Sequence, residues 1–366
     1  MSEPNASSAS PSTNLAEIKD LSVSFITDAG SIKAVDGVSF TIPRGTVVGV
    51  VGESGSGKSV TARSIIKLLP ETATTSGAVM LSKRDGTGEL DVLSLSGEDL
   101  QRMRGSEAAM VFQEPNSVLN PVYTIGWQIE EGLRAHGMKD KKQLRAKAID
   151  ILKKVGIPDA ETRVDYYPHQ FSGGQKQRIV IAMALVLNPG LILADEPTTA
   201  LDVTVQAEIL DLLRLAKDEF GASVLIITHN MGVIADLADQ VVVMYRGHVV
   251  EQGDVAEIFS NPKTDAARRL VFPAGAPRSE GDLLPGRRMV RVAFNGTHTT
   301  DKPLVASLAI ECNALVSIVA ADTRVVNGQT LGSMLLALPE DEAAAQRAIE
   351  YIRAYPGLSF EEVDPA

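Results

Sequence analysis

The segment GESGSGKS, residues 52–59, decides the fold of this chain because it fits the pattern G-x-x-x-x-G-K-[ST] in full. It follows an apolar run, VVGVV at 47–51, and precedes a helical pattern from Ser59 to Leu69. Between a strand and a helix, such a loop turns backbone N–H groups toward phosphates, and its lysine and last hydroxyl reach the outer phosphates and magnesium. We expect this phosphate loop to bind a nucleotide through Gly52, Glu53, Ser54, Gly55, Ser56, Gly57, Lys58 and Ser59.

A pair of carboxylates follows a second apolar run, LILA at 191–194. Asp195 ends that predicted strand and is placed to hold Mg²⁺ together with Ser59, and Glu196 stands beside it as the candidate general base. Two solvated acids at a strand end would show the same pattern. The phosphate loop earlier in the chain favours the catalytic interpretation.

The segment from Leu15 to about Ser260 alternates short β-branched runs with helical patterns. This alternation predicts an α/β fold with a mostly parallel sheet. Between residues 121 and 167 the pattern is wholly helical, which predicts a helical subdomain inserted into the α/β core. A simple packing insertion is the alternative for that segment.

A change of composition near Asn261 predicts a linker over residues 261–287, which are rich in proline and small residues. A second domain is expected at 288–366, with Asn327-Gly328 as the turn of a hairpin. The predicted order βαββαβ favours a ferredoxin-like fold. Its elements are a strand at 289–294, a helix at 303–311, strands at 315–326 and 329–337, a helix at 340–355 and a strand at 358–363.

The composition limits the partners. The chain has 46 acidic against 35 basic side chains and a formal net charge of -11, so we expect no nucleic acid as partner. Its single cysteine, Cys312, excludes an intramolecular disulfide. Residues 1–14 are expected to be a disordered tail without the pattern of a signal peptide. The longest apolar run is far shorter than the ~20 residues that cross a bilayer, so work at a membrane would require a partner.

The segment FSGGQKQR, residues 171–178, is more specific to one protein family than the other motifs, which would fit many nucleotidases. Ser172 and the glycines after it expose backbone donors at the start of a helix that is predicted to reach Asn188. With this signature segment, residues 15–260 resemble the ATPase subunits of ATP-binding cassette (ABC) transporters. The resemblance implies that ATP binds between the phosphate loop and the signature residues Ser172, Gly173, Gly174 and Gln175.

The same resemblance implies roles for residues outside those motifs. Phe25 would stack on adenine, and Gln113 would sense Mg²⁺ and the attacking water while coupling the site to transmembrane subunits. His229 would contact the γ phosphate. The loop at 199–202 would let paired subunits sense each other's sites, with a helix N-cap at Asp202 as the weaker alternative for that segment.

The resemblance also implies the assembly. Two copies would close head to tail on ATP, each signature segment facing the other copy's phosphate loop, and hydrolysis would let them reopen. The helical subdomain would carry this motion to permease subunits at the cytoplasmic face of the cell membrane, where the chain would be peripheral. An extracytoplasmic substrate-binding protein would be an indirect partner.

The transported solute divides the interpretation. The cassette resembles the ATPases of dipeptide and oligopeptide importers, whereas the C-terminal domain resembles the regulatory domain of methionine importers. We expect import of methionine, with cytosolic methionine as a feedback inhibitor bound near Phe294, Asn295 and residues 314–321. Peptide import is the alternative for the whole chain, and a purely dimerising role is the alternative for the domain. An ATPase that acts on ribosomes or DNA would require basic patches that the sequence does not show.

Overall fold

The computed structural model describes residues 13–27, 30–199, 201–271, 287–295, 303–326, 329–355 and 358–363. The described residues form two compact units. Unit 1 reaches from the N-terminal side to His229 and includes Leu237–Val250, and unit 2 consists of Asn230–Asp236 and the residues from Glu251 onward. No helix among these residues is long and apolar enough to span a membrane.

A six-stranded sheet carries the site of unit 1, in the order β10-β9-β3-β8-β7-β6. The neighbouring strands from β9 to β6 in this order pair in parallel, as predicted for an α/β fold. The core strands β3, β7 and β8 are buried along their whole length because apolar residues fill both of their faces. The bounds are β3 Val47–Val51, β6 Ala108–Val111, β7 Leu191–Asp195, β8 Ser223–Ile227, β9 Gln240–Tyr245 and β10 His248–Asp254.

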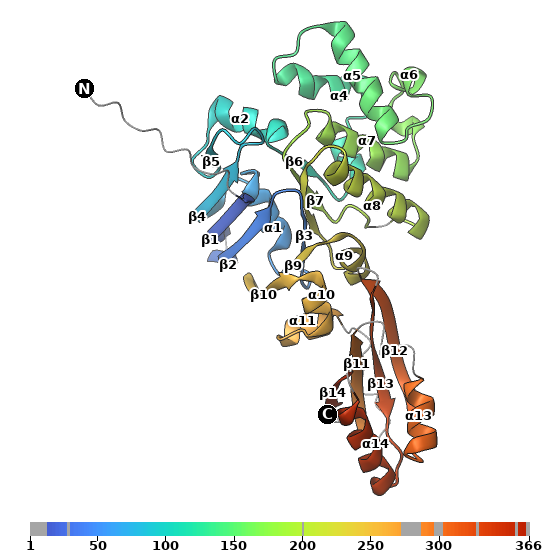
Figure 1. Cartoon of the computed structure of the whole chain (residues 1–366). Helices are drawn as coiled ribbons and strands as arrows, with labels where there is room; N and C mark the ends of the chain where they lie inside the picture. The colour runs from blue at the N-terminus through green and yellow to red at the C-terminus, as the bar shows by residue number, and fades with distance from the viewer. Residues whose placement is uncertain are drawn as a thin grey trace, which may run out of the picture. The chain divides into compact units, whose positions relative to one another are not determined.

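A second, antiparallel sheet in the order β2-β1-β4-β5 was not predicted from the sequence. Apolar residues of both sheets, Val23 and Val50 among them, belong to one buried cluster with α1 (Lys58–Ile65), so the two sheets share a core. Figure 1 shows this sheet in blue beside α1. Its strands are β1 Asn14–Thr27, β2 Gly30–Pro43, β4 Ala73–Ser82 and β5 Glu89–Asp91.

Three helices occupy the segment that was predicted as a helical subdomain: α4 (Ile125–Ala135), α5 (Lys141–Lys154) and α6 (Ala160–Arg163). Thr124 accepts a hydrogen bond from a backbone N–H at the start of α4, and Asp140 does the same for α5, as expected of N-caps. The buried residues of α4 recur at the spacing of one helical face: Ile125, Ile129 and Leu133. In Figure 1 these helices form a green group beside α7 and α8.

The remaining helices before the C-terminal domain lie between or after the strands of the first two sheets. They are α2 Gly97–Ser106, α3 Pro115–Val118, the 3₁₀ turn η1 Pro168–Gln170, α7 Gly173–Leu185, α8 Val203–Asp218, α9 Met231–Leu237, α10 Val255–Ser260 and α11 Asp265–Val271. Helices α1 and α7 are shorter than predicted. Helix α1 ends at Ile65 rather than Leu69, and α7 ends at Leu185 rather than Asn188. Lys67 and Asn188 have left-handed backbone angles, which end a helix.

The C-terminal part of unit 2 has the predicted βαββαβ order, and its four strands form an antiparallel sheet in the order β12-β13-β11-β14. Asp341 caps α14, which packs on the sheet through Ala345, Ala348, Ile349 and other buried residues. The elements are β11 Met289–Asn295, α13 Leu304–Glu311, β12 Ser317–Val326, β13 Gln329–Ala337, α14 Glu342–Ala354 and β14 Leu358–Val363.

Two boundary predictions need correction. The linker was predicted from residue 261, but Asp265–Val271 is helical, because Glu251 accepts hydrogen bonds from the backbone of Lys263 and Thr264 and fixes the turn before α11. The tail was predicted to end at residue 14, but Asn14 already belongs to β1.

Three other predictions fall on segments that the structure does not describe. The tail at 1–12 and the linker at 272–286 lie outside the described residues. So do Asn327 and Gly328, although their neighbours Val326 and Gln329 pair across the predicted hairpin.

Candidate functional site

The site lies at the edge of the parallel sheet where the strands reach their carboxyl ends. Register places Val50 beside Ile227 and Ile227 beside Asp195, so the segments that follow β3, β7 and β8 meet at one edge. The phosphate loop follows β3, Glu196 follows β7, and His229 comes after β8. The sheet therefore brings together motifs that are far apart in the sequence.

The phosphate loop follows a path that only glycine fits at two positions. Gly52 has φ +156°, and a Cβ there would lie 2.2 Å from the carbonyl oxygen of Met244. Gly57 has φ +99°, and its Cβ would lie 2.7 Å from the carbonyl oxygen of Ala34. The backbone can therefore curve tightly between β3 and α1, as the phosphate-binding interpretation requires.

Lys58 begins α1 and is 7% exposed. Its Nζ donates to the carbonyls of Gly52 at 2.9 Å and Glu53 at 2.7 Å, and it lies 3.4 Å from Ser56 Oγ. Burial lowers the pKa of Lys58, and the nearby carboxylates of Glu196 and Asp195 oppose that shift. The ammonium is thus held inside the loop by backbone acceptors, where phosphate oxygens could take their place.

Asp195 and Ser59 form the oxygen pair expected of a magnesium site. Ser59 Oγ donates to Asp195 Oδ1 at 2.7 Å, and the Asp195 side chain is only 4% exposed. Arg63 Nη2 lies 3.6 Å from the other carboxylate oxygen. Hydroxyl and carboxylate oxygens beside phosphates are the ligands that Mg²⁺ prefers, so the residues present fit this ion.

Glu196 is surrounded by hydrogen-bond donors. Gln113 Nε2 and Thr199 Oγ1 both donate to Glu196 Oε2 at 3.0 Å, and His229 Nδ1 lies 3.5 Å from Oε1. The backbone of Glu196 has φ 47°, an uncommon value for a non-glycine residue, while its N–H donates to the carbonyl of Ile227 at 2.9 Å. A carboxylate oriented in this way, 21% exposed, can accept a proton from a water molecule.

The signature residues begin α7 in a capping box. Gln175 N donates to Ser172 Oγ at 3.3 Å, and Ser172 N donates to Gln175 Oε1 at 3.2 Å. No described hydrogen bond or ion pair joins Ser172, Gly173, Gly174 or Gln175 to residues 52–59 of the same chain. One chain thus brings together the phosphate loop, the carboxylates, Gln113 and His229, but does not bring the signature residues into contact with them.

Phe25 lies on β1 and is partly buried against the shared core. Its partner across β1 and β2 is Ile32, and Ala34 on the same β2 strand lies against Gly57. This end of the antiparallel sheet therefore borders the phosphate loop. Stacking of Phe25 on adenine stays a prediction.

Sequence reasoning missed two contacts of this site. Thr199 was assigned only to a loop between subunits, yet its hydroxyl contacts Glu196. Arg63 was not considered, although it lies four residues after Ser59 and hence on the same face of α1. That spacing was the available signal for Arg63, whereas a single Thr three residues after an acid is too common to single out.

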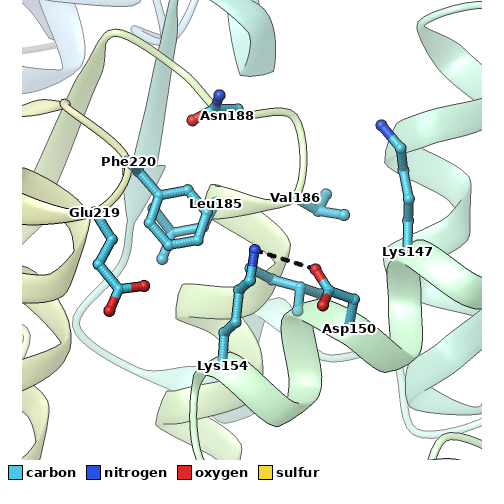
Figure 2. A pocket seen from close by; sticks show the side chains of 9 residues that line it. Lys147, Asp150, Lys154, Leu185, Val186, Asn188, Glu219 and Phe220 are labelled. Atoms are coloured by element: carbon cyan, nitrogen blue, oxygen red, sulfur yellow. Dashed lines mark ion pairs between the residues drawn. The ribbon is translucent and has the colours of Figure 1, made fainter.

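A separate hollow of about 280 Å³ lies between α5 and the ends of α7 and α8 (Figure 2). Lys154 pairs there with Asp150 at 3.1 Å, and its ammonium lies 5.2 Å from the centre of the Phe220 ring. None of its lining residues belongs to the site described above. The hollow is lined by Lys147, Asp150, Ile151, Lys154, Leu185, Val186, Asn188, Glu219 and Phe220.

Comparison with known proteins identifies the family. The family model described as ABC transporter matches residues 35–199. A Brucella abortus (strain 2308) protein named "Putative peptide import ATP-binding protein" is 50% identical over 248 residues, which cover 68% of this chain and 73% of that protein. The chain belongs to the ABC transporter ATPases. This ABC ATPase is also 46% identical to the oligopeptide transport ATP-binding protein OppD of Bacillus subtilis (strain 168), over 74% of each chain.

Solved structures agree with the fold. This ABC ATPase matches the dimeric, post-hydrolysis ATP-binding cassette MJ0796, bound to ADP and Pi, with a TM-score of 0.57 and 29% identity over 66% of this chain and 98% of that one. It also matches cbiO1 from Clostridium perfringens, part of the ABC transporter complex cbiONQ, with a TM-score of 0.57 and 28% identity over 72% and 97%. The fold class and the ATPase activity predicted from the sequence are therefore confirmed.

The C-terminal domain has a family of its own. Residues 288–362 match the model described as NIL domain. The match begins and ends within the segment whose βαββαβ order was predicted from the sequence, and it includes all of the described elements from β11 to the penultimate residue of β14.

Proposed function

We propose that this ABC ATPase energises the uptake of peptides through a permease partner. The identity of 50% to a relative named for peptide import, with 46% to an oligopeptide transport protein, carries the proposal. The methionine uptake that we favoured from the sequence has less support, because these relatives match the alternative. Peptides are therefore the solute class that the comparisons favour.

Hydrolysis would use the groups already described. Lys58 and the backbone of the phosphate loop bind the phosphates of ATP, while Ser59 and Asp195, with Gln113, hold the metal. Mg²⁺ supplies positive charge to the phosphates when bound. Glu196, oriented by Gln113 and Thr199, accepts the proton of the attacking water. His229, 65% exposed at the rim of the site, contacts the γ phosphate.

A second copy of the chain completes each site. The signature residues form the start of α7, where Ser172 and Gly173 are exposed to solvent. Among the described contacts, none joins them to the phosphate loop of their own chain. The backbone N–H groups of Gly173 and Gly174, which take no part in the capping box, and the hydroxyl proton of Ser172 can bind an anionic oxygen of ATP held by the partner. The dimeric relative with ADP and Pi supports this arrangement.

The membrane partners follow from this assembly. The chain would lie peripherally at the cytoplasmic face of the cell membrane, with α4 to α6 carrying the motion of closure to permease subunits. A substrate-binding protein on the other side would deliver the peptide. The relatives named for import support this arrangement for the present chain.

A second candidate function rests on the C-terminal domain. The NIL domain match at 288–362 and the ferredoxin-like order favour a regulatory role with methionine as ligand, as the sequence resemblance implied. Of the contacts predicted for methionine, the side chains of Phe294 and Asn295 lie outside the described residues. Within the segment 314–321, which was also predicted to contact methionine, Ala314 is buried and Leu315 is 79% exposed.

Uptake by cells that lack this chain tests the proposal. Cells of the source organism without the gene should lose uptake of a labelled tripeptide and keep uptake of labelled methionine. Wild-type protein should restore the loss, and the Lys58→Ala variant, which cannot hold the phosphates, should not. Loss of methionine uptake with unchanged peptide uptake would contradict the proposal and identify methionine as the transported solute.

A further inference from the structure

Arg178 joins three helices next to the signature residues. It lies on α7, one turn after Gly174, and its side chain is 19% exposed. Its Nη1 donates to the carbonyls of Val155 at 3.0 Å and Gly156 at 3.3 Å, which follow the end of α5. Its Nη2 pairs with Glu208 Oε2 on α8 at 2.6 Å.

The segments around Arg178 approach one another closely at two glycines. A Cβ on Gly156 would lie 2.4 Å from Arg178 Nη1, and a Cβ on Gly174 would lie 2.7 Å from Cγ1 of Val205. Val205 precedes Glu208 by one turn of α8, just as Gly174 precedes Arg178 on α7. The close contact of Gly174 with Val205 and the ion pair of Arg178 with Glu208 therefore lie on the same face of each helix and hold α7 against α8.

The start of each helix lies next to residues of the proposed ATPase site. The signature residues begin α7, and Asp202 caps α8 by accepting a hydrogen bond from Val205 N at 2.9 Å. Asp202 closes the segment that holds Glu196 through Thr199. The Arg178–Glu208 pair thus joins the helix that presents the signature residues to the helix that follows the general base.

We propose that Arg178, through its ion pair with Glu208, is a positioning residue that sets the signature residues for hydrolysis in the phosphate loop of a second copy. This inference rests on the head-to-tail pair of the proposed function. Arginine suits the role because its planar fork binds two carbonyls and a carboxylate at once, which a lysine cannot do. The described contacts of Arg178 are with Val155, Gly156 and Glu208, none of which is assigned to ATP or to the attacking water.

Steady-state kinetics of the full chain provide the first test. Glu208→Ala should lower kcat about tenfold, the effect of losing one charge-assisted hydrogen bond, with KM changed less than about twofold. Arg178→Ala should lower kcat further because the hydrogen bonds to the carbonyls of Val155 and Gly156 are lost too. Arg178→Lys should restore only part of the lost kcat. Asp211→Ala, which removes an exposed pair with Arg214 on the same helix, is the matched control and should behave as wild type.

Mixing two kinds of chain separates positioning from general damage. A trace of hydrolytically competent chain is combined with an excess of Glu196→Gln chain, so that nearly every competent chain has a non-hydrolysing partner, and a single turnover of ATP is timed. Competent Arg178→Ala chain with Glu196→Gln partners should hydrolyse ATP at the same rate as competent wild-type chain with the same partners. Wild-type chain with partners that carry both Glu196→Gln and Arg178→Ala should be slowed about tenfold, since the signature residues act across the pair.

The opposite pattern would overturn the inference. If the Arg178→Ala change slowed hydrolysis only in the chain that carries it, Arg178 would serve its own site rather than the partner's. An unchanged kcat for Glu208→Ala would equally overturn the inference. A fluorescent ATP analogue, bound by every variant with wild-type affinity, would show that the fold is intact. These assays require no solute, so failure of the peptide proposal would not affect them.

Discussion

At the scale of single residues, the site depends on one carboxylate and the donors around it. Glu196 Oε2 accepts hydrogen bonds from Gln113 and Thr199, so the proposed general base is already oriented in the chain without ATP. Neutral hydrogen bonds of this kind contribute about 1 kcal/mol. Thr199→Val keeps the shape but removes the hydroxyl, and it should lower kcat about fivefold. Thr199→Ser is the matched control and should remain near wild type, and equal kcat values for Val and Ser would contradict the role.

Lys58 makes a prediction about stability and pH. Burial lowers the pKa of Lys58 from its ordinary value of 10.5, so the charged form costs stability in the folded protein. That cost is fully present below the lowered pKa and disappears as the pH rises to 10.5, because the unfolded chain then binds more protons. Lys58→Met should raise the free energy of unfolding by about 1 kcal/mol at pH 7 and abolish ATP binding.

The measurement is chemical denaturation at pH 7 and at higher pH. The advantage of Lys58→Met over wild type should shrink as the pH rises through the lowered pKa. Lys83→Met, which changes a partly exposed lysine outside the site, supplies the comparison. A Lys58→Met variant that is less stable than wild type at pH 7 would show that the carbonyl contacts of Lys58 outweigh its burial.

At the scale of elements, the contact between α7 and α8 depends on Gly174. An alanine there would place Cβ 2.7 Å from Val205 Cγ1 and push the helices apart, whereas no atom lies within 4 Å of a Cβ on Gly173. Gly174→Ala should therefore destabilise the chain by about 1 kcal/mol. Gly173→Ala should stabilise it slightly through helix propensity. Thermal unfolding measures both, and equal shifts would contradict the packing argument.

The N-cap of α14 gives a second prediction at this scale. Asp341 accepts a hydrogen bond from Ala344 N at 3.0 Å, so Asp341→Ala should destabilise the C-terminal domain by about 1 kcal/mol. The adjacent Glu340→Ala removes only an exposed pair with Arg287 and should have little effect. Hydrogen exchange in α14 reports the difference between the two variants.

Much of the molecule could be predicted from local pattern. Short apolar runs located β3, β7 and β8, and the phosphate loop and acid pair located the site, because each signal lies within a few adjacent residues. The pairing of β1 with β4 in the antiparallel sheet, such as Val23 with Thr75, was missed because it joins segments about fifty residues apart. The contact of Arg178 with Glu208 was missed because these residues lie far apart in the sequence, whereas Arg63 had a local signal in its spacing from Ser59.

At the scale of the whole molecule, the two domains favour different solutes. The relatives of the cassette are named for peptides, whereas the C-terminal match and fold favour a methionine-binding regulator. Both are possible in one chain if the regulator senses a product of peptide breakdown. Calorimetric titration of L-methionine into the full chain should then show heat that alanine and a dipeptide do not. Equal signals from all three ligands would contradict a methionine regulator.

The central claim is that ATP is hydrolysed at a site that two copies complete, with Glu196 as its base. Sedimentation of the Glu196→Gln variant with and without ATP tests it most directly, with Glu219→Gln as the matched control. The account predicts a stable ATP-dependent dimer for Glu196→Gln, with hydrolysis reduced at least about a hundredfold, and normal hydrolysis for the control. A monomer in ATP, or unchanged hydrolysis by Glu196→Gln, would contradict the account.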